Sequence, residues 1–394
     1  MDAIKQTAES VGDVIHNSTF QGNGQQPSQD ALPSKMKAGI IEKFNSSVAF
    51  QEGREVPSDL KGHDILVQIK AAGMCHTDLQ VLQGVYASQG SHEGMIGSHE
   101  PAGIVVALGP DAMSAGKVKV GSRVGSINTF GFCGKCKACK ANGPQLCENV
   151  KGLLGLTIDG GFAQYAKMDA RVVGLIPESI PFDQAAPLFC AGATIYGALK
   201  AVGIEKGKWL AIVGLGGLGH LGVQYAKALG FKVVALDNRQ EALDLLKEAP
   251  ANLRPDQSYL MHDDEKKNEQ IIQQLGSGFY DSDPGVDKAI ICAEARHLPR
   301  VTQQFLRKGG IICDVGLPAD GPLEVDAFAL SFKEQTIRGR LICTPKEAQD
   351  LVDLHAQEGC RTHIEKTYPI EEIKDVYKHY ESKDLKGRIV VTFD

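Results

Sequence analysis

Four closely spaced cysteines form the most distinctive chemical pattern in this chain. Their spacing is C-x2-C-x2-C-x7-C, at Cys133, Cys136, Cys139 and Cys147. Four thiolates can surround one zinc ion tetrahedrally at about 2.3 Å, which leaves no position for a substrate. We therefore predict a structural zinc site. The alternatives are a disulfide pair and a cysteine-rich ribbon that binds nucleic acid, but no basic face supports such a ribbon.

A glycine-rich turn predicts a dinucleotide site. The glycines follow an apolar run at residues 209–213 and open a pattern of helical spacing, and they are Gly214, Gly216, Gly217 and Gly219. Glycines here allow a tight turn, a close approach of the backbone to pyrophosphate and close packing of helix on strand. The alternative is a helix N-terminus without a ligand.

The residue at the end of the next predicted strand indicates which dinucleotide binds. Asp237 stands 18 residues after Gly219, where a carboxylate can accept hydrogen bonds from ribose hydroxyls and would repel a 2'-phosphate. The sequence thus favours NAD(H) over NADP(H). Arg239 could partly relax that choice, although a solvated arginine is the simpler interpretation.

The pattern of apolar runs, Gly and Pro changes along the chain and indicates which elements position these residues. Residues 37–187 hold short apolar runs separated by Gly and Pro, which predicts a strand-rich, barrel-like domain. Residues 188–332 alternate strands with helices, as in a doubly wound parallel sheet, so the fold class is α/β. Residues 333–394, including the run TIRGRLIC, are expected to pack back on the first domain, and residues 1–36 to form a flexible extension.

Composition excludes several classes of protein. The 394 residues are 43% hydrophobic with a net charge of -6, which gives no reason to expect nucleic acid as a partner. No apolar run approaches the roughly 18 to 20 residues of a membrane-spanning helix. The first 35 residues contain acids and no arginine, so we expect a cytoplasmic protein rather than a mitochondrial one. In that setting clustered cysteines indicate metal binding or catalysis rather than disulfides.

An ordered set of motifs carries a family resemblance. The motifs are GMCHTDL, GSHEPAG, the four-cysteine lobe, PLFCAGATIYGAL, GLGGLG, RKGGIICDVGLP and GRIVV. From about Lys37 to Asp394 the chain resembles the zinc-dependent alcohol dehydrogenases of the medium-chain dehydrogenase/reductase family, and it looks closest to the branch with the fungal enzymes. The resemblance implies a GroES-like β-barrel catalytic domain, a Rossmann domain and a homo-oligomer, either a dimer or a tetramer.

The resemblance also implies a catalytic zinc, the second zinc of the chain. Its ligands would be Cys75, His99 and Cys190, with a fourth position left for water or alcohol. Glu100 matches a carboxylate that can approach the zinc during ligand exchange. Asp78 matches the acid that accepts a hydrogen bond from the ligand histidine.

Other positions match residues that serve the reaction or the cofactor. Thr77 matches the hydroxyl that removes the proton of the alcohol. His76 and Arg388 match pyrophosphate contacts, and Val315 and Leu317 match residues beside the nicotinamide. The implied substrate pocket contains Tyr86, Thr129, Phe130 and Leu317.

One position departs from many relatives. A histidine that passes the proton to solvent is replaced by Gln80, which cannot act as a base near neutral pH. The proton must therefore leave through water or a ribose hydroxyl.

The resemblance implies reversible hydride transfer between NAD(H) and a primary or secondary alcohol, or an aldehyde in the reverse direction. Two alternatives keep the same chemistry: a polyol dehydrogenase, and an aldehyde reductase of a biosynthetic pathway. A third alternative is a non-catalytic dinucleotide-binding protein.

Overall fold

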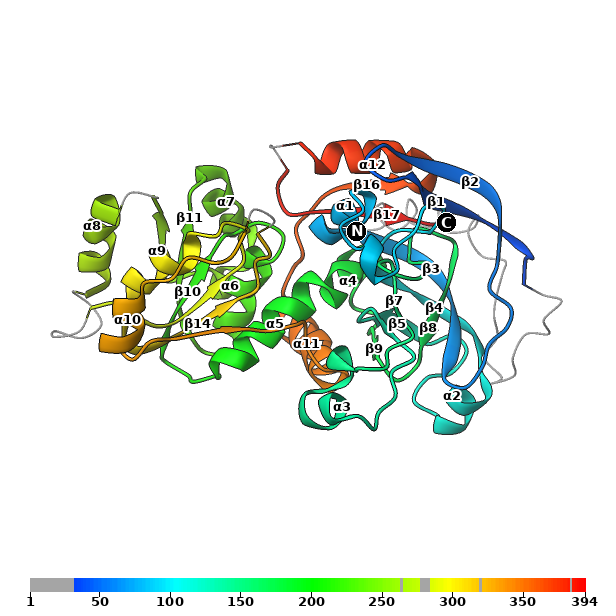
Figure 1. Ribbon diagram of the computed structural model, residues 1–394, viewed down its shortest axis with the longest axis horizontal. Coiled ribbons are helices and arrows are strands. Elements are labelled where there is room, and N and C mark those ends of the chain that lie inside the picture. The colour runs from blue at the N-terminus through cyan, green and yellow to red at the C-terminus, as the bar shows by residue number, and fades with distance from the viewer. Residues whose placement is uncertain (1–31, 263–264, 277–283, 319–320, 383–384) are drawn as a thin grey trace, which may run out of the picture.

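Two bodies lie side by side in the computed structural model (Figure 1). The structure describes residues 32–262, 265–276, 284–318, 321–382 and 385–394. One body is built from the middle of the chain, and the other combines the first part of the chain with its last strands. Most of the expected N-terminal extension, residues 1–31, lies outside the described residues.

A six-stranded parallel sheet organises the first body, in the order β12-β11-β10-β13-β14-β15. The strands are β10 (Trp209–Val213), β11 (Lys232–Asp237), β12 (Gln257–Leu260), β13 (Val286–Ile291), β14 (Leu306–Asp314) and β15 (Thr336–Gly339). In β10, Leu210 and Ile212 enter one core while Ala211 and Val213 enter another. Both faces of the sheet are therefore buried, which explains why its strands are continuous apolar runs and confirms the predicted doubly wound sheet.

Helices cover both faces of this sheet. They are α6 (Gly219–Ala228), α7 (Gln240–Leu245), α8 (Glu265–Gly276), α9 (Leu298–Phe305) and α10 (Ala327–Phe332). We expected the first of them to open at Gly214, but α6 begins at Gly219. The intervening residues form the turn, in which Gly214 has a φ of 86° that favours glycine.

Two further expectations for this body need correction. The sequence predicts a helix over about residues 299–307 and a strand from Ile311, but α9 ends at Phe305 and β14 begins at Leu306. The segment Thr336–Gly339 was expected to pack on the other domain, but as β15 it pairs in parallel with β14 at the edge of the six-stranded sheet. Its short polar sequence gave no sign of which sheet it would join.

The second body is a strand-rich barrel. Its main sheet has the order β16-β17-β3-β4-β5-β9, and β8 also pairs with β3. The strands of this body are β1 (Lys35–Lys43), β2 (Ser47–Glu55), β3 (Asp64–Met74), β4 (Glu100–Leu108), β5 (Arg123–Ser126), β6 (Thr129–Phe130), β7 (Gly152–Leu153), β8 (Tyr165–Asp169), β9 (Val173–Leu175), β16 (Ile364–Pro369) and β17 (Arg388–Thr392). Because β17 pairs with β3, the end of the chain completes a sheet begun near its start.

The remaining helices pack around this body and between the two. They are α1 (His76–Leu82), α2 (Pro110–Ala115), α3 (Lys137–Asn142), α4 (Phe182–Ala185), α5 (Ala191–Val202), α11 (Pro345–Glu358) and α12 (Ile373–Tyr380). One apolar core contains Ala71 and Val390 of the barrel together with Ile195 of α5 and Leu210 of the parallel sheet. This shared core joins the two bodies.

Within the described residues, no single helix is long and apolar enough to cross a membrane. The bent pair of residues 182–189 and 191–202 reaches the length and composition only when the two helices are counted together. Most residues of α5 are buried in the shared core.

A buried histidine connects two helices at this core. The Tyr225 hydroxyl on α6 lies 3.0 Å from Nδ1 of His355 on α11. Burial lowers the pKa of His355 to about 4, from an ordinary value of 6.5. The unfolded chain therefore takes up a proton between these values that the folded chain excludes. The stabilisation is complete above about pH 6.5 and is lost as the pH falls toward 4.

We predict that His355→Gln makes folding less sensitive to acid. Between pH 7 and pH 5, the free energy of unfolding of the wild type should fall by about 2 kcal/mol more than that of the variant, since glutamine does not titrate. Denaturant titrations at both pH values measure this difference. Tyr225→Phe is the control, because it removes the hydrogen bond yet leaves His355 buried. Equal losses in wild type and His355→Gln would contradict the prediction.

Candidate active site

The register of two antiparallel strands brings the first candidate ligands together. Gly73 of β3 lies opposite Glu100 of β4, so Cys75 and His99, each just outside the paired residues, emerge at the same end of the sheet. A side chain at residue 73 would collide with the Glu100 carboxylate. Glycine at residue 73 therefore leaves room for the Glu100 carboxylate.

A third segment brings Cys190 to the same place. This residue lies between α4 and α5, and its Sγ is 3.9 Å from Sγ of Cys75 and 3.0 Å from Nε2 of His99. Two thiolates on one zinc ion would lie about 3.8 Å apart, given bonds of about 2.3 Å. The donor atoms of the three residues and a carboxylate oxygen of Glu100 all lie within 4.8 Å of one another. This donor set fits a zinc ion.

Hydrogen bonds orient the histidine for metal binding. Nδ1 of His99 lies 2.9 Å from Oδ1 of Asp78, and the backbone N–H of His99 donates to the same oxygen. With Nδ1 donating to the carboxylate, Nε2 is left to face the two thiols, as a metal ligand requires. A hydrogen bond with Cys190, together with the charge of Arg388, lowers the pKa of Cys75 and favours the thiolate.

Glu100 takes part in a buried ion pair. Its carboxylate pairs with the guanidinium of Arg388, and both side chains are at least 97% buried. Burial raises the pKa of Glu100 to about 7, and the charge of Arg388 acts against that rise. Because one carboxylate oxygen has no hydrogen-bond partner, Glu100 retains an acceptor beside the three candidate ligands.

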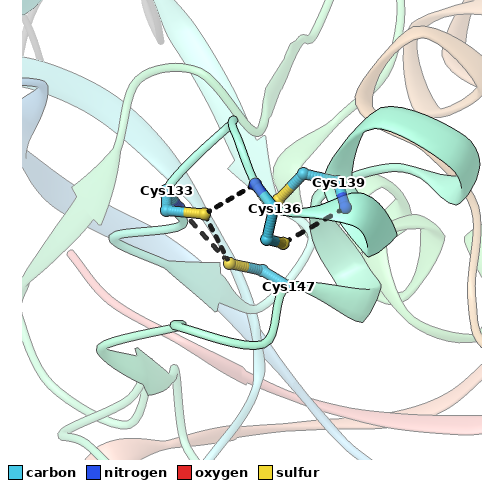
Figure 2. A group of neighbouring side chains, drawn as sticks. All are labelled: Cys133, Cys136, Cys139 and Cys147. Atoms are coloured by element: carbon cyan, nitrogen blue, oxygen red, sulfur yellow. Dashed lines mark hydrogen bonds between the residues drawn. The ribbon is translucent and has the colours of Figure 1, made fainter.

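The four-cysteine lobe forms a second group of donors. Figure 2 shows the side chains of Cys133, Cys136, Cys139 and Cys147 converging, and their sulfurs lie within 4.8 Å of one another. The sulfurs of Cys133 and Cys147 are 3.6 Å apart. Backbone N–H groups donate to the sulfurs of Cys133, Cys136 and Cys147, which favours thiolates. Four such donors fit one tetrahedral zinc ion and leave no open position.

The glycine turn faces the active-site cavity. A Cβ at Gly216 would meet no atom within 4 Å, whereas one at Gly217 would lie 3.0 Å from the guanidinium of Arg388. Nε of Arg388 is buried without a hydrogen-bond partner. The glycine turn thus has open space above it, and beside it lies a guanidinium whose Nε–H has no hydrogen-bond partner. This arrangement fits the pyrophosphate of a dinucleotide.

Asp237 is tied to the same turn. Its carboxylate accepts hydrogen bonds from the backbone N–H groups of Leu215, at 2.7 Å, and Arg239, at 2.9 Å. Asp237 is buried, with a relative exposure of 5%. These two bonds leave lone pairs on the carboxylate for a further donor.

One cavity of about 930 Å³ connects the candidate zinc ligands with the glycine turn. The residues on its wall that the sequence had singled out are Cys75, His76, Thr77, Tyr86, His99, Thr129, Cys190, Gly216, Gly217, Arg239, Val315, Leu317 and Arg388. Gln80 lies behind this wall, where it accepts a hydrogen bond of 2.9 Å from the Tyr86 hydroxyl.

Phe130 is a correction to the expected pocket. It does not line the cavity, and the ammonium of Lys167 lies 5.8 Å from the centre of its ring. Its neighbour Thr129 lines the cavity instead. Adjacent residues of a strand point to opposite faces, so only one of the two can face the pocket.

Sequence reasoning missed several residues of the cavity wall. Among them are Glu294, Tyr380 and residues 340–342. None lies in a motif with a spacing tied to chemistry, and only the approach of the two bodies brings them to the site.

Fold and site together define a zinc-binding dehydrogenase, and comparisons with known proteins agree. Residues 61–178 match the alcohol dehydrogenase GroES-like domain, and residues 217–357 match the zinc-binding dehydrogenase family.

Whole-chain relatives carry the same activity in their names. An alcohol dehydrogenase of Geobacillus stearothermophilus is 34% identical over 91% of this chain and 100% of its own. One from Schizosaccharomyces pombe is 32% identical over 91% and 98% of the two chains. These bacterial and fungal relatives thus match at similar identity.

A solved structure matches over the same length. The alcohol dehydrogenase of the archaeon Aeropyrum pernix superposes with a TM-score of 0.76 and 28% identity, covering 91% of this chain and 100% of that one. The chain belongs to the zinc-dependent alcohol dehydrogenase family.

We predict that the two cysteine groups bind zinc independently. The wild type should contain two zinc ions per chain, and Cys75→Ala and Cys136→Ser should each contain one. Only Cys136→Ser should also lower the melting temperature by several degrees, because a closed structural site stabilises the folded chain. Elemental analysis and thermal unfolding measure both effects. Cys360→Ala, which removes a thiol outside both groups, should retain two. Unchanged zinc in Cys75→Ala would refute the assignment of the catalytic site.

Proposed function

We propose that this protein catalyses reversible hydride transfer between NAD(H) and an alcohol or its aldehyde, with Cys75, His99 and Cys190 holding the catalytic zinc. The observation that carries the proposal is the single cavity in which these three side chains and the glycine turn face each other. When bound, zinc supplies a Lewis acid that lowers the pKa of an alcohol hydroxyl, and the dinucleotide supplies the hydride acceptor.

The chain's own residues would bind and orient the dinucleotide. Gly216, Gly217 and Arg388 would hold its pyrophosphate, and Val315 and Leu317 would contact its nicotinamide. A second hollow, of about 430 Å³ and partly lined by Leu215 and Arg239, adjoins the glycine turn and is suited to the adenosine.

Asp237 supports NAD(H) rather than NADP(H). Its carboxylate places a negative charge beside Leu215, at the edge of the hollow suited to the adenosine. There it would accept hydrogen bonds from the ribose hydroxyls and repel a 2'-phosphate. The Nε of Arg239 lies 3.8 Å from the same carboxylate. The negative charge of Asp237 therefore partly offsets the positive charge of Arg239.

Thr77 would accept the proton of the substrate hydroxyl and pass it on. It lines the cavity two residues from Cys75. The amide of Gln80 cannot act as a base, and its oxygen already accepts a hydrogen bond from the Tyr86 hydroxyl. Water or a ribose hydroxyl must therefore carry the proton onward.

The cavity wall favours small or medium alcohols with an apolar substituent. Tyr86, Leu153, Leu156 and Ile342 contribute apolar surface, and Thr129 is small. A polyol dehydrogenase and an aldehyde reductase of a biosynthetic pathway remain the alternatives, and a substrate panel separates them.

Thr77→Ala should lower kcat for alcohol oxidation about a hundredfold or more, because a relay hydroxyl typically contributes at least that factor. Thr77→Ser restores the hydroxyl and should retain most of the activity. The assay follows NADH formation from primary, secondary and polyhydroxy alcohols, each also with NADP. Full activity in Thr77→Ala would remove this residue from the mechanism. No turnover by the wild type with any alcohol or aldehyde would favour a non-catalytic dinucleotide-binding protein.

We also propose a homo-oligomer formed through the edge of the parallel sheet. Phe328 and Phe332 of α10 are 64% and 73% exposed, and their rings stack 4.2 Å apart. The adjoining β15 is an edge strand. Exposed aromatics beside an open edge favour contact with a second copy of this chain.

Replacing both Phe328 and Phe332 with Asp should convert an oligomer into monomers in sedimentation velocity, since four buried charges in a symmetric dimer contact would not be tolerated. Met113→Asp, at a 53% exposed residue on α2, is the control and should leave the assembly intact. An unaltered oligomer in the double variant would place the interface elsewhere.

A further inference from the structure

An ion pair spans the opening between the two bodies. Nε2 of His76, the first residue of α1 in the barrel, lies 3.0 Å from Oε2 of Glu294. Glu294 follows β13 of the parallel sheet, so the contact crosses from one body to the other. Both side chains line the shared cavity and are 38% and 37% exposed.

Glu294 also lies next to the glycine turn. Its neighbour Ala293 packs so closely on this turn that a Cβ at Gly214 would come within 2.7 Å of the Ala293 side chain. Glu294 thus follows the residue that packs on this turn, and its side chain lines the same cavity as Gly216 and Gly217. No resemblance or motif assigns a role to Glu294.

Pyrophosphate and this carboxylate compete for the same partner. His76 is the residue expected to contact the pyrophosphate, but its Nε2 already faces Glu294. One imidazole N–H makes one strong hydrogen bond, and a carboxylate beside a phosphate of like charge is destabilising. A pyrophosphate that takes up the hydrogen bond of this Nε2 must therefore draw His76 away from Glu294 or displace the carboxylate.

We propose that Glu294 competes with the cofactor's pyrophosphate for His76 and thereby weakens dinucleotide binding and speeds its release. This inference rests on the proposed function, because it requires a dinucleotide in the cavity. Glu294 would act as a positioning residue for His76 in the free protein. By making the free state more favourable, it lowers the net affinity for the cofactor.

The test is an equilibrium titration of NADH, followed by its fluorescence, with the zinc-loaded full chain. Glu294→Gln should lower the Kd about two- to fivefold, the range expected when a partly exposed charged pair is lost. Stopped-flow displacement should show a slower release of NADH. Both readouts are independent of turnover.

Glu248→Gln is a matched control. Glu248 lies on the same body, and its Oε2 is 2.9 Å from Nδ1 of His363 in the C-terminal segment. It does not line either cavity beside the glycine turn. The substitution removes the same charge from another His–Glu pair and should leave the Kd unchanged.

A double-variant cycle tests whether the effect passes through His76. In a His76→Ala background, Glu294→Gln should no longer lower the Kd. A Kd of Glu294→Gln equal to or higher than that of the wild type overturns the inference while leaving NADH binding, and the proposed function, intact. An equal decrease of the Kd in the His76→Ala background, or in Glu248→Gln, also overturns the inference, because such a decrease would reflect long-range charge alone. A wild type that binds no NADH overturns both proposals.

Discussion

The pairing of β3 with β4 is the constraint on which the rest of the site depends. It places Gly73 opposite Glu100, so the segments that carry Cys75 and His99 leave the sheet side by side. A shift of one residue would turn every side chain of a strand to the other face and separate the two. The absence of a side chain at residue 73 leaves room for the Glu100 carboxylate, and that carboxylate in turn pairs with Arg388. Strand register, glycine and ion pair thus form one connected arrangement.

Arg388 extends this arrangement to the other body. It begins β17, the strand that closes the barrel sheet against β3, and its side chain lies over Gly217 of the dinucleotide turn. The same guanidinium therefore pairs with Glu100, beside the candidate metal ligands, and lies next to the turn that we propose binds the pyrophosphate. On the proposed function, Arg388 would link the site of the metal with the site of the hydride acceptor, which the reaction requires in one cavity.

The sequence was informative where chemistry depends on local spacing. The four cysteines stand close together in the sequence, and so do the four glycines of the turn. The parallel sheet could be predicted because strands buried on both faces are continuous apolar runs. Cys190 is a single cysteine in an apolar segment, so the sequence connects it to Cys75 only through the family resemblance. Phe130 and Thr129 could not be told apart without knowing which face of β6 is turned to the cavity. The placement of β15 and the contact of His76 with Glu294 depend on how distant segments pack, and no local sequence pattern predicts such packing.

The most direct test of this account is a crystal structure of the zinc-loaded protein with NADH, with anomalous scattering measured at the zinc edge. The account predicts two anomalous peaks per chain, one among Cys133, Cys136, Cys139 and Cys147 and one among Cys75, His99 and Cys190, with the nicotinamide in the cavity that the second peak faces. A missing peak at Cys75, His99 and Cys190, or a dinucleotide bound outside that cavity, would contradict it.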